Sequence, residues 1–326
     1  EENADIIALG RPLLADPDYP LKALQGRREE IVKCIACNTC MDLIFLFQPI
    51  QCIQNPCAGY GFEVEPNEKA EVSQKVLVIG EGPAALEAAR VSGVRGHDTV
   101  FWKTGGQPGG YWSWLIHAFV NDKLKAIRNH GVEVDTKDTV TMEMVHQLSP
   151  DIVLVENEVS PCVPNIPGID RENVVQAVDI FSGEKEVEGK VVIVGGGSIG
   201  VQCALYLGKK GVDITIIEEK RGPAFKIEQL TRKILVQLLK AGDVKLLFRS
   251  KVTAIDADGM AFVDAEGNEG RVDAEQIVLA LEMEPRAGLI ENLEKEDFNP
   301  VALDYCHSQR NVYDSVRQGA EAARMI

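Results

Sequence analysis

The sequence lacks an excess of positive charge, long apolar runs and grouped histidines. Its 34 lysines and arginines stand against 50 acidic residues, and the net charge of −16 argues against non-specific binding to nucleic acid or to an anionic membrane. No apolar run approaches the roughly 20 residues of a membrane-spanning helix, and no secretory signal is visible. The five histidines show neither triad nor metal-ligand spacing. We therefore expect a cytoplasmic protein and assign it no catalytic residue.

What the sequence has instead is a group of four closely spaced cysteines. Cys34, Cys37, Cys40 and Cys52 form a C-x2-C-x2-C-x11-C pattern. Four thiolates that converge from one segment can hold zinc or an iron–sulfur cluster. The apolar segment 43–47 lies between them, and an apolar shell that keeps water away favours a redox cluster. Zinc and unligated thiols are the alternatives, whereas close spacing without a secretory signal disfavours disulfides.

The remaining composition is that of an ordinary globular protein. With 326 residues, 45% of them hydrophobic and 26% charged, the chain is long enough for about two domains. Its first part predicts a short strand over 5–9 and a helix that continues through Leu21 to Gly26. One strand and one helix cannot bury their apolar faces alone, so this part needs a partner domain or the rest of the chain. The chain starts Glu1-Glu2-Asn3 without methionine, which fits processing or truncation upstream.

A glycine-rich turn follows the first strongly buried strand. Residues 76–79 predict this strand, and Gly80 and Gly82 lie in the turn. A helix is expected from there to about Val94, followed by a strand over 99–102. Such a βαβ start binds dinucleotides, because glycines let the backbone approach a pyrophosphate that rests on the helix N-terminus.

The same pattern recurs about 115 residues later. A strand over 191–194 leads into a turn with Gly195, Gly197 and Gly200. A helix to about Gly211 follows, and then a second strand over 213–217 that ends at Glu218. A carboxylate at that strand end accepts both ribose hydroxyls and repels a 2′-phosphate, so NAD is preferred over NADP. One fingerprint alone is weak and fits a tight turn in another α/β fold, but two in the same context are strong together.

Downstream of the second fingerprint, apolar periodicity predicts a helix over 227–241 that Gly242 ends. The other predicted elements are five short strands and a final helix: 244–248, 252–255, 260–263, 277–281, 301–304 and 312–325. The chain is therefore predicted to be an α/β protein.

The order of these parts resembles the C-terminal half of the iron–sulfur flavoproteins related to old yellow enzyme, such as 2,4-dienoyl-CoA reductase and trimethylamine dehydrogenase. Four stretches carry the resemblance: 8–17, 34–59, 78–90 and 191–200. The family implies the tail of an FMN-binding (β/α)8 barrel, a 4Fe–4S cluster loop and two Rossmann-like domains of glutathione-reductase type, the second inserted in the first. The implied ranges are 1–28 for the barrel tail, 29–62 for the cluster segment, 75–170 with 275–326 for the FAD or ADP domain, and 171–274 for the NAD(H) domain.

The resemblance also implies a role for each matching residue. Gly10 and Arg11 help to hold the FMN phosphate, and the four cysteines ligate the 4Fe–4S cluster. The implied FAD or ADP site consists of Gly80, Gly82, Ala85 and Asp304, and the implied NAD(H) site of Gly195, Gly197, Gly200 and Glu218.

Three positions depart from the family in the implied FAD site. Lys103 stands where the family has an acidic residue for the adenosine ribose. The family's Ala-Thr-Gly turn is replaced by Glu156-Asn157-Glu158, and its Gly-Asp near the C-terminus by Leu303-Asp304. Each change adds bulk or the wrong charge where the backbone approaches the cofactor, so a vestigial or ADP-only site is an alternative to FAD binding.

The resemblance implies an electron-transfer module that passes electrons from NADH through FAD and the cluster to FMN, in a barrel that reduces an activated C=C bond. That N-terminal barrel lies outside these residues, and the full protein is expected to be a homo-oligomer. One alternative, which the C-x2-C-x2-C spacing resembles more, is an amine-dehydrogenase-like protein whose electrons leave FMN through the cluster to an external electron-transfer flavoprotein. Another alternative is a non-catalytic scaffold subunit with a vestigial FAD site.

Overall fold

A computed structural model of the protein describes residues 5–59, 68–104, 117–137, 139–156, 159–223, 229–285, 288–303 and 312–326. The chain divides into two compact units, 1–158 with 285–326 and 159–284. In sequence order the second unit therefore interrupts the first. Residues 159–170 and 275–284, which we expected in the first dinucleotide-binding domain, belong to the second unit.

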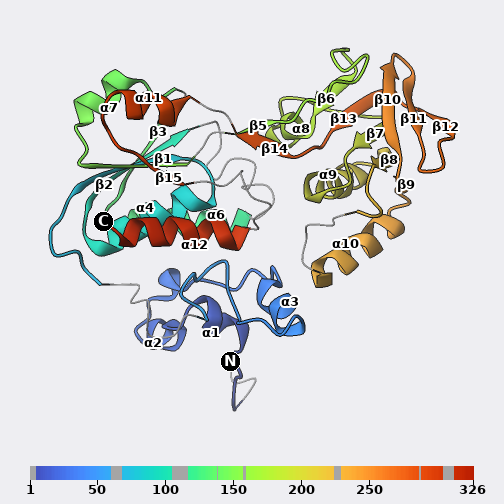
Figure 1. The fold of residues 1–326 in the computed structure, drawn as a ribbon. Coiled ribbons are helices and arrows are strands. Elements are labelled where there is room, and N and C mark those ends of the chain that lie inside the picture. Colours follow the sequence, from blue (N-terminus) through green and yellow to red (C-terminus); the bar gives the residue numbers. More distant parts are fainter. Residues whose placement is uncertain are drawn as a thin grey trace. The chain divides into compact units, whose positions relative to one another are not determined.

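The first unit contains a parallel five-stranded sheet with the order β15-β4-β1-β2-β3 (Figure 1). Its strands are β1 (Lys75–Gly80), β2 (Asp98–Thr104), β3 (Glu133–Lys137), β4 (Ile152–Glu156) and β15 (Val301–Leu303). Every neighbouring pair is parallel. The order reverses beside β1, so the carboxyl ends of β1 and β4 border a topological switch point, where such sheets usually bind ligands.

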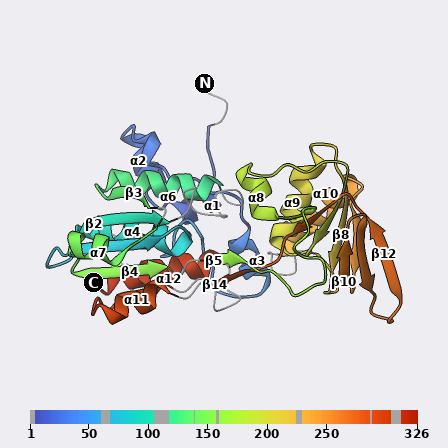
Figure 2. The ribbon, with the colours of Figure 1, turned by 90° about the horizontal axis from the view of Figure 1, so that it is seen from above.

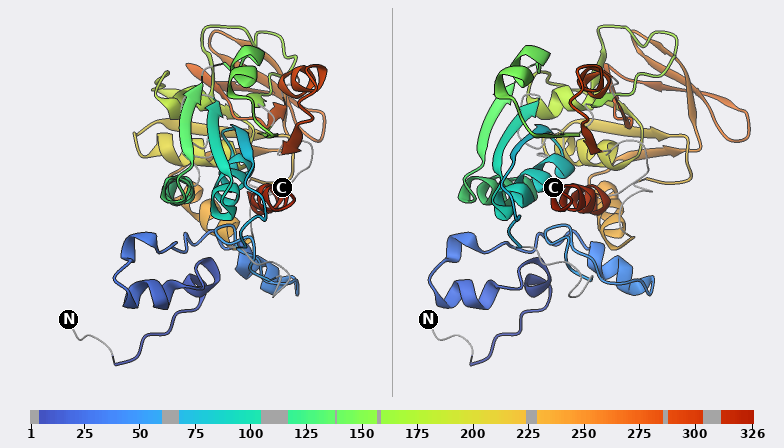
Figure 3. Two further views of the ribbon diagram at one scale, coloured as in Figure 1. Left: turned by 90° about the vertical axis from the view of Figure 1, so that its left-hand side faces the viewer. Right: turned by 60° about the vertical axis from the view of Figure 1, so that its left-hand side comes forward.

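Helices cover both faces of this sheet, and alternate residues of β1 separate the two cores. The helices are α4 (Pro83–Arg95), α6 (His117–Asn129), α7 (Met142–Leu148), α11 (Leu289–Lys295) and α12 (Val312–Arg324). Val76 and Val78 pack with α4, α6 and α12, whereas Leu77 and Ile79 pack with α7 and α11. Helix α12 lies along α4 (Figure 3). A Cβ atom at Gly319 of α12 would lie only 2.1 Å from the Ala84 carbonyl oxygen, so this helix contact requires glycine.

The segment before the sheet is mostly short helices and loops. It contains α1 (Arg11–Ala15), α2 (Tyr19–Leu24), the 3-10 helix η1 (Arg28–Glu30) and α3 (Thr39–Phe45). The strand predicted over 5–9 is wrong: these residues form no strand, because an isolated strand has no neighbour to pair with. The single helix predicted up to Gly26 is also wrong, since Asp16 and Pro17 separate α1 from α2. The Asp16 carboxylate instead accepts from the Val32 N–H at 2.9 Å and pairs with Lys22 at 2.8 Å.

The second unit combines a parallel and an antiparallel sheet (Figure 2). The parallel sheet has the order β6-β13-β7-β8-β9, and the antiparallel sheet the order β10-β11-β12. A two-stranded sheet pairs β5 with β14. The elements in chain order are β5 (Val159–Pro161), β6 (Val174–Gln176), α8 (Ala177–Ser182), β7 (Lys190–Val194), α9 (Ser198–Gly208), β8 (Asp213–Glu218), α10 (Gln229–Ala241), β9 (Lys245–Phe248), β10 (Lys251–Asp256), β11 (Gly259–Val263), β12 (Glu269–Asp273), β13 (Gln276–Leu279) and β14 (Met283–Pro285). Val192 and Ile217 of the parallel sheet pack against Val252 and Met260 of the antiparallel sheet.

The α/β class and the parallel sheets predicted from the two fingerprints are confirmed. The helix after the second fingerprint ends at Gly208 rather than at Gly211, because the Lys210 and Gly211 N–H groups donate in a tighter turn to Leu207 and Gly208. The predicted helix 227–241 is observed from Gln229, and residues 227 and 228 lie outside the described residues. Among the described residues, every helix is too short or too polar to cross a membrane.

Candidate functional site

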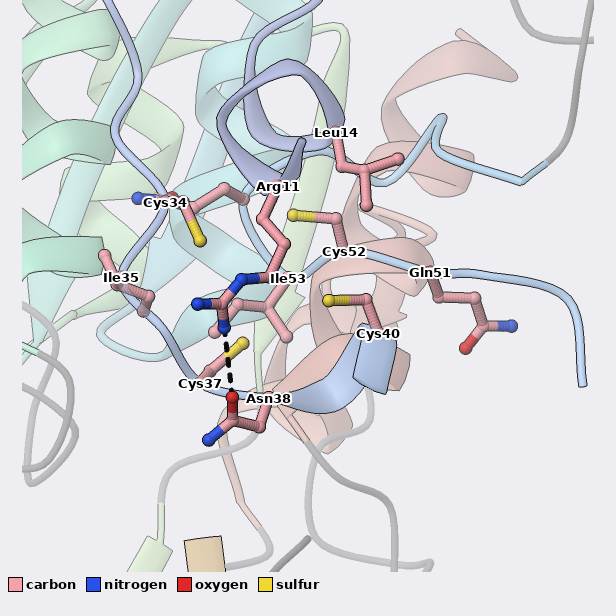
Figure 4. Close-up of a pocket in the computed structure, with 11 residues that line it drawn as sticks. Arg11, Leu14, Cys34, Ile35, Cys37, Asn38, Cys40, Gln51, Cys52 and Ile53 are labelled. Atoms are coloured by element: carbon pink, nitrogen blue, oxygen red, sulfur yellow. Dashed lines mark hydrogen bonds between the residues drawn. The ribbon is translucent and has the colours of Figure 1, made fainter. Parts of the chain in front are cut away.

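Four cysteine side chains line one pocket in the N-terminal part of the first unit. Cys34 and Cys37 precede α3, Cys40 lies within it, and Cys52 comes from the loop that follows. Their sulfur atoms point towards a common space (Figure 4). Left-handed backbone at Ala36 and Asn38, with φ of 55° and 67°, bends the chain between the first three cysteines. The structure therefore brings all four predicted ligands together.

The four cysteines are not arranged as a site for one metal ion. Within the described ranges, no three His, Cys, Asp or Glu side chains are placed to hold a single ion. A tetrahedral zinc site has bonds of about 2.3 Å, which require its sulfur atoms to lie about 4 Å apart. The cysteines thus share a space without converging on one point. Cys40 and Cys52 are each 8% exposed, and burial raises the pKa of both thiols.

Arg11 extends from α1 into the space between the cysteines (Figure 4). Its Nη1 donates to Asn38 Oδ1 at 3.1 Å. A guanidinium in this position favours negative charge on the surrounding sulfur atoms. Gly10 is the N-cap residue of α1. The role of Gly10 and Arg11 at an FMN phosphate stays a prediction.

A buried charge network joins the cysteine segment to α4 and α6. Lys123 of α6 is 3% exposed, and its Nζ donates to the Gln54 carbonyl at 2.9 Å and to Glu87 Oε2 at 2.6 Å. Gln54 Nε2 in turn donates to Asp122 Oδ2 at 2.9 Å. Burial acts to raise the pKa of Glu87, but Arg90 and Lys123 hold that pKa below its ordinary value. The carboxylate therefore stays ionised, and it holds Lys123 beneath the loop that carries Cys52.

The second glycine loop has the geometry of a dinucleotide-binding turn. Gly195 has a φ of +106°, and a Cβ atom at Gly200 would lie 1.8 Å from the Gly195 carbonyl oxygen. Gly197 is the N-cap residue of α9, and a Cβ atom there would meet nothing within 4 Å. Glu218 at the end of β8 accepts from the Gly196 N–H at 2.7 Å and from the Lys220 N–H at 2.8 Å. The loop is open above Gly197 and has a carboxylate at its edge.

The first glycine loop has the same turn, but a side chain of the protein occupies it. Gly80 has a φ of +150°, and Gly82 is the N-cap residue of α4. The Glu156 side chain enters this loop and accepts from the Gly82 N–H at 2.5 Å and the Ala84 N–H at 3.2 Å. Burial raises the pKa of Glu156 to about 7, although the hydrogen bonds from Gly82 and Ala84 act in the opposite direction. An internal carboxylate therefore takes the N–H groups that a ligand would use.

The remaining residues assigned to this first site are buried or lie outside the described part. Ala85 and Leu303 are fully buried, and Lys103 is 3% exposed. Asp304 and Asn157 lie outside the described residues. Their predicted contacts with a flavin stay predictions.

Sequence reasoning missed the two side chains that organise these sites, Glu156 and Lys123. We predicted that Glu156 adds bulk and charge near a cofactor, but not that it binds the glycine loop. The available signal was an acidic residue at the end of a buried strand at the switch point. Lys123 had no such signal, because one lysine in an amphipathic helix is usually solvated.

Comparison with known proteins places the chain among oxidoreductases. The family model for pyridine nucleotide-disulphide oxidoreductases matches residues 127–304. NADH oxidase from Thermoanaerobacter brockii is 32% identical over 341 residues, which cover 100% of this chain and 52% of that protein. Bilirubin reductase from Mediterraneibacter gnavus is 31% identical over 336 residues, covering 99% of this chain and 52% of that protein. A 2-naphthoyl-CoA reductase in complex with 2-naphthoyl-CoA matches with a TM-score of 0.90 and 26% identity, over 97% of this chain and 50% of that one. The chain spans about half the length of the curated relatives it matches.

Proposed function

Because the chain belongs to the pyridine nucleotide-disulphide oxidoreductase family, we propose that it is the NAD(H)-binding and electron-transferring part of an iron–sulfur flavoprotein oxidoreductase. Its homologues cover it as the C-terminal part of flavoproteins related to 2,4-dienoyl-CoA reductase, NADH oxidase and old yellow enzyme. The observation that carries the proposal is the second glycine loop, which is open above Gly197 and bordered by Glu218.

The residues of the second loop fit NAD(H). Gly195 and Gly200 allow the tight turn of the backbone, and Gly197 leaves open space beside the N-terminus of α9, whose N–H groups can donate to a pyrophosphate. Glu218 is held by two backbone N–H groups at the place where a ribose would lie, so its carboxylate can accept from the ribose hydroxyls. When bound, NADH supplies a hydride.

The cysteine pocket fits a 4Fe–4S cluster better than zinc. Among the described residues the four cysteines share one pocket without forming a single-ion site, and two of them are almost fully buried. We propose that their thiolates ligate the cluster and that Arg11, which lines the same pocket, offsets the negative charge. When bound, such a cluster carries single electrons.

The rest of the electron path is proposed from the relatives. Relatives named NADH oxidase, cinnamate reductase and 2-naphthoyl-CoA reductase favour delivery to FMN in a barrel outside these residues, where an activated C=C bond is reduced. Membership of the family implies FAD as well as NAD(H), but Glu156 fills the first glycine loop. A hydride from NADH needs a flavin to accept it, because a cluster takes only single electrons, so the filled loop leaves the route from NADH without its acceptor in this chain.

The filled first loop favours a second candidate function. If the path from NADH through FAD is closed, electrons can run in the amine-dehydrogenase direction, from FMN through the cluster to an external flavoprotein. In that case the dinucleotide-binding units are mainly structural.

An anaerobic absorbance spectrum with iron, sulfide and released-flavin assays, before and after NADH addition, tests the proposal. We expect about four iron and four sulfide per chain, the composition of a 4Fe–4S cluster. The variant Cys40→Ser should lose the cluster, whereas Cys57→Ser should keep it, since Cys57 does not line the pocket. A chain that binds neither iron nor NADH would contradict the proposed function. Iron without NADH binding would leave the amine-dehydrogenase direction.

A further inference from the structure

The two glycine loops of this chain differ in what lies next to their N-cap glycines. A Cβ atom placed on Gly197 of the second loop would meet nothing within 4 Å. The same atom placed on Gly82 of the first loop would lie 2.6 Å from Glu156 Oε1. The space that glycine leaves for a cofactor is therefore open in one loop and filled in the other.

The Glu156 carboxyl group accepts hydrogen bonds in the first loop where the oxygens of a phosphate would accept them. It is 4% exposed, and its two carboxylate oxygens accept from the Gly82 and Ala84 N–H groups at 2.5 and 3.2 Å. These donors belong to the first turn of α4, where the N–H groups have no partner within the helix. In a dinucleotide site the same groups donate to the pyrophosphate.

The sheet register explains why the second loop is open. Ile79 of β1 pairs with Val155, which places Glu156 beside Gly80. Val194 of β7 pairs with Leu279, which places Ala280 at the corresponding position beside Gly195. The end of β4 therefore lies beside the first glycine turn as the end of β13 lies beside the second. A long acidic side chain stands there in one unit and a methyl group in the other.

We propose that the Glu156 carboxyl group occupies the pyrophosphate position of the first glycine loop, so that this loop does not hold FAD or ADP. The first unit then uses its dinucleotide-type sheet to support the cysteine pocket through α4 and α6. The inference leaves the proposed NAD(H) and cluster sites unchanged, because it concerns the first loop alone, but it favours the amine-dehydrogenase direction of electron flow.

Dialysis of the full chain against FAD, and separately ADP, tests this inference, with saturating NADH present to occupy the second loop. The wild type should bind neither probe. Glu156→Ala should gain at least tenfold in affinity for one of the two probes and approach one bound molecule per chain. Glu156→Gln keeps the bulk and should bind like the wild type.

A converse variant tests the same idea in the second unit. Ala280→Glu should place a carboxylate beside Gly195 and weaken NADH binding at least tenfold. Circular dichroism and tryptophan fluorescence show whether each variant is folded. NADH titration of Glu156→Ala should match the wild type, and a wild type that does not bind NADH would contradict the proposed function without touching this inference.

Two results would overturn the inference. One is a wild-type chain that holds FAD at one per chain in the first loop. The other is a folded Glu156→Ala variant that gains affinity for neither FAD nor ADP. A folded Ala280→Glu variant with unchanged NADH binding would contradict the idea that the side chain at this strand end determines whether the glycine loop is open.

Discussion

The carboxylates that end β4 and β8 meet the neighbouring glycine loops in different ways. Glu156 lies across the N-terminus of α4 and takes two of its N–H groups, whereas Glu218 accepts from Gly196 and Lys220 at the side of its loop. Both are acidic residues at strand ends, but their strands lie on opposite sides of the glycine-bearing strand. At the scale of single residues, a carboxylate on β4 fills the glycine loop next to it, whereas a carboxylate on β8 leaves its loop open for a ligand.

The raised pKa of Glu156 predicts a pH-dependent stability. Its pKa is about 7 in the folded chain against 4.5 as the ordinary value, with burial the main cause and Glu81 a further one. The folded state therefore binds this proton more tightly, and the stability it contributes is lost as pH rises from about 4.5 to about 7. The shift corresponds to about 3 kcal/mol.

The variant Glu156→Gln should remove this dependence. Its unfolding free energy relative to the wild type should increase by up to about 3 kcal/mol between pH 5 and pH 8. Urea unfolding followed by tryptophan fluorescence measures it, because all three tryptophans, at 102, 112 and 114, belong to the first unit. A difference between variant and wild type that stays constant with pH would show that Glu156 does not titrate in this range.

Glu218 predicts the nucleotide preference of the second loop. Glu218→Ala should weaken NADH binding by about 10- to 100-fold, the loss expected for hydrogen bonds to a charged acceptor. Glu219→Ala is a matched control, since Glu219 is the exposed next residue. Fluorescence titration with NADH and NADPH measures both constants. Equal losses in the two variants would mean that Glu218 has no specific contact with the ribose.

At the scale of elements, helix α6 connects the cysteine segment to the first unit through its buried face. Lys123 on that face bonds Gln54 and Glu87, whereas Lys125, two residues later, pairs with Glu29 and is 44% exposed. Two lysines of one helix thus have opposite environments. A buried hydrogen-bonded ion pair is costly to break, even though Arg90 still pairs with Glu87 here, and an exposed pair contributes little.

Substitution of these two lysines tests the role of α6. Lys123→Met should destabilise the first unit by about 1–3 kcal/mol, because Glu87 loses one buried partner but keeps Arg90. Iron retention should fall with it, since the Gln54 carbonyl loses its donor next to Cys52. Lys125→Met should change unfolding free energy by less than about 1 kcal/mol. Urea unfolding and iron content measure both effects, and similar values for the two variants would contradict this role.

At the scale of the whole molecule, a run of four apolar residues at the end of α3 is exposed. Ile44, Phe45, Leu46 and Phe47 are 44%, 65%, 53% and 96% exposed. Contiguous apolar surface of this kind marks an interaction site. The chain spans about half the length of its relatives, so this run is a candidate contact for sequence outside these residues.

The exposed run predicts self-association of the isolated chain. Sedimentation velocity should show association that grows with protein concentration, and Phe45→Ser with Phe47→Ser should reduce it. Ile234→Ser with Leu238→Ser on α10 is the control, as these side chains are half exposed but belong to the second unit. Association that both pairs reduce equally would assign it to general apolar exposure rather than to this run.

Local pattern in the sequence was sufficient for much of this fold. The buried strands β1 and β7, the glycine turns after them and the helices α4 and α9 follow from spacing that adjacent residues alone determine. The cysteine pattern likewise predicted which thiols share a pocket. The strand predicted over 5–9 failed because a strand depends on a neighbour, which periodicity does not reveal.

The sequence by itself determined the α/β class, the two glycine turns, the acid that follows the second of them and the grouping of the four cysteines. These depend on contacts between residues close in the chain. Only the tertiary structure decided that Glu156 enters the first loop and that Lys123 lies beneath the cysteine segment. Each of these contacts joins residues 69 or more positions apart. Sheet order and helix packing bring these residues together, and a local sequence pattern does not show which distant residues will be in contact.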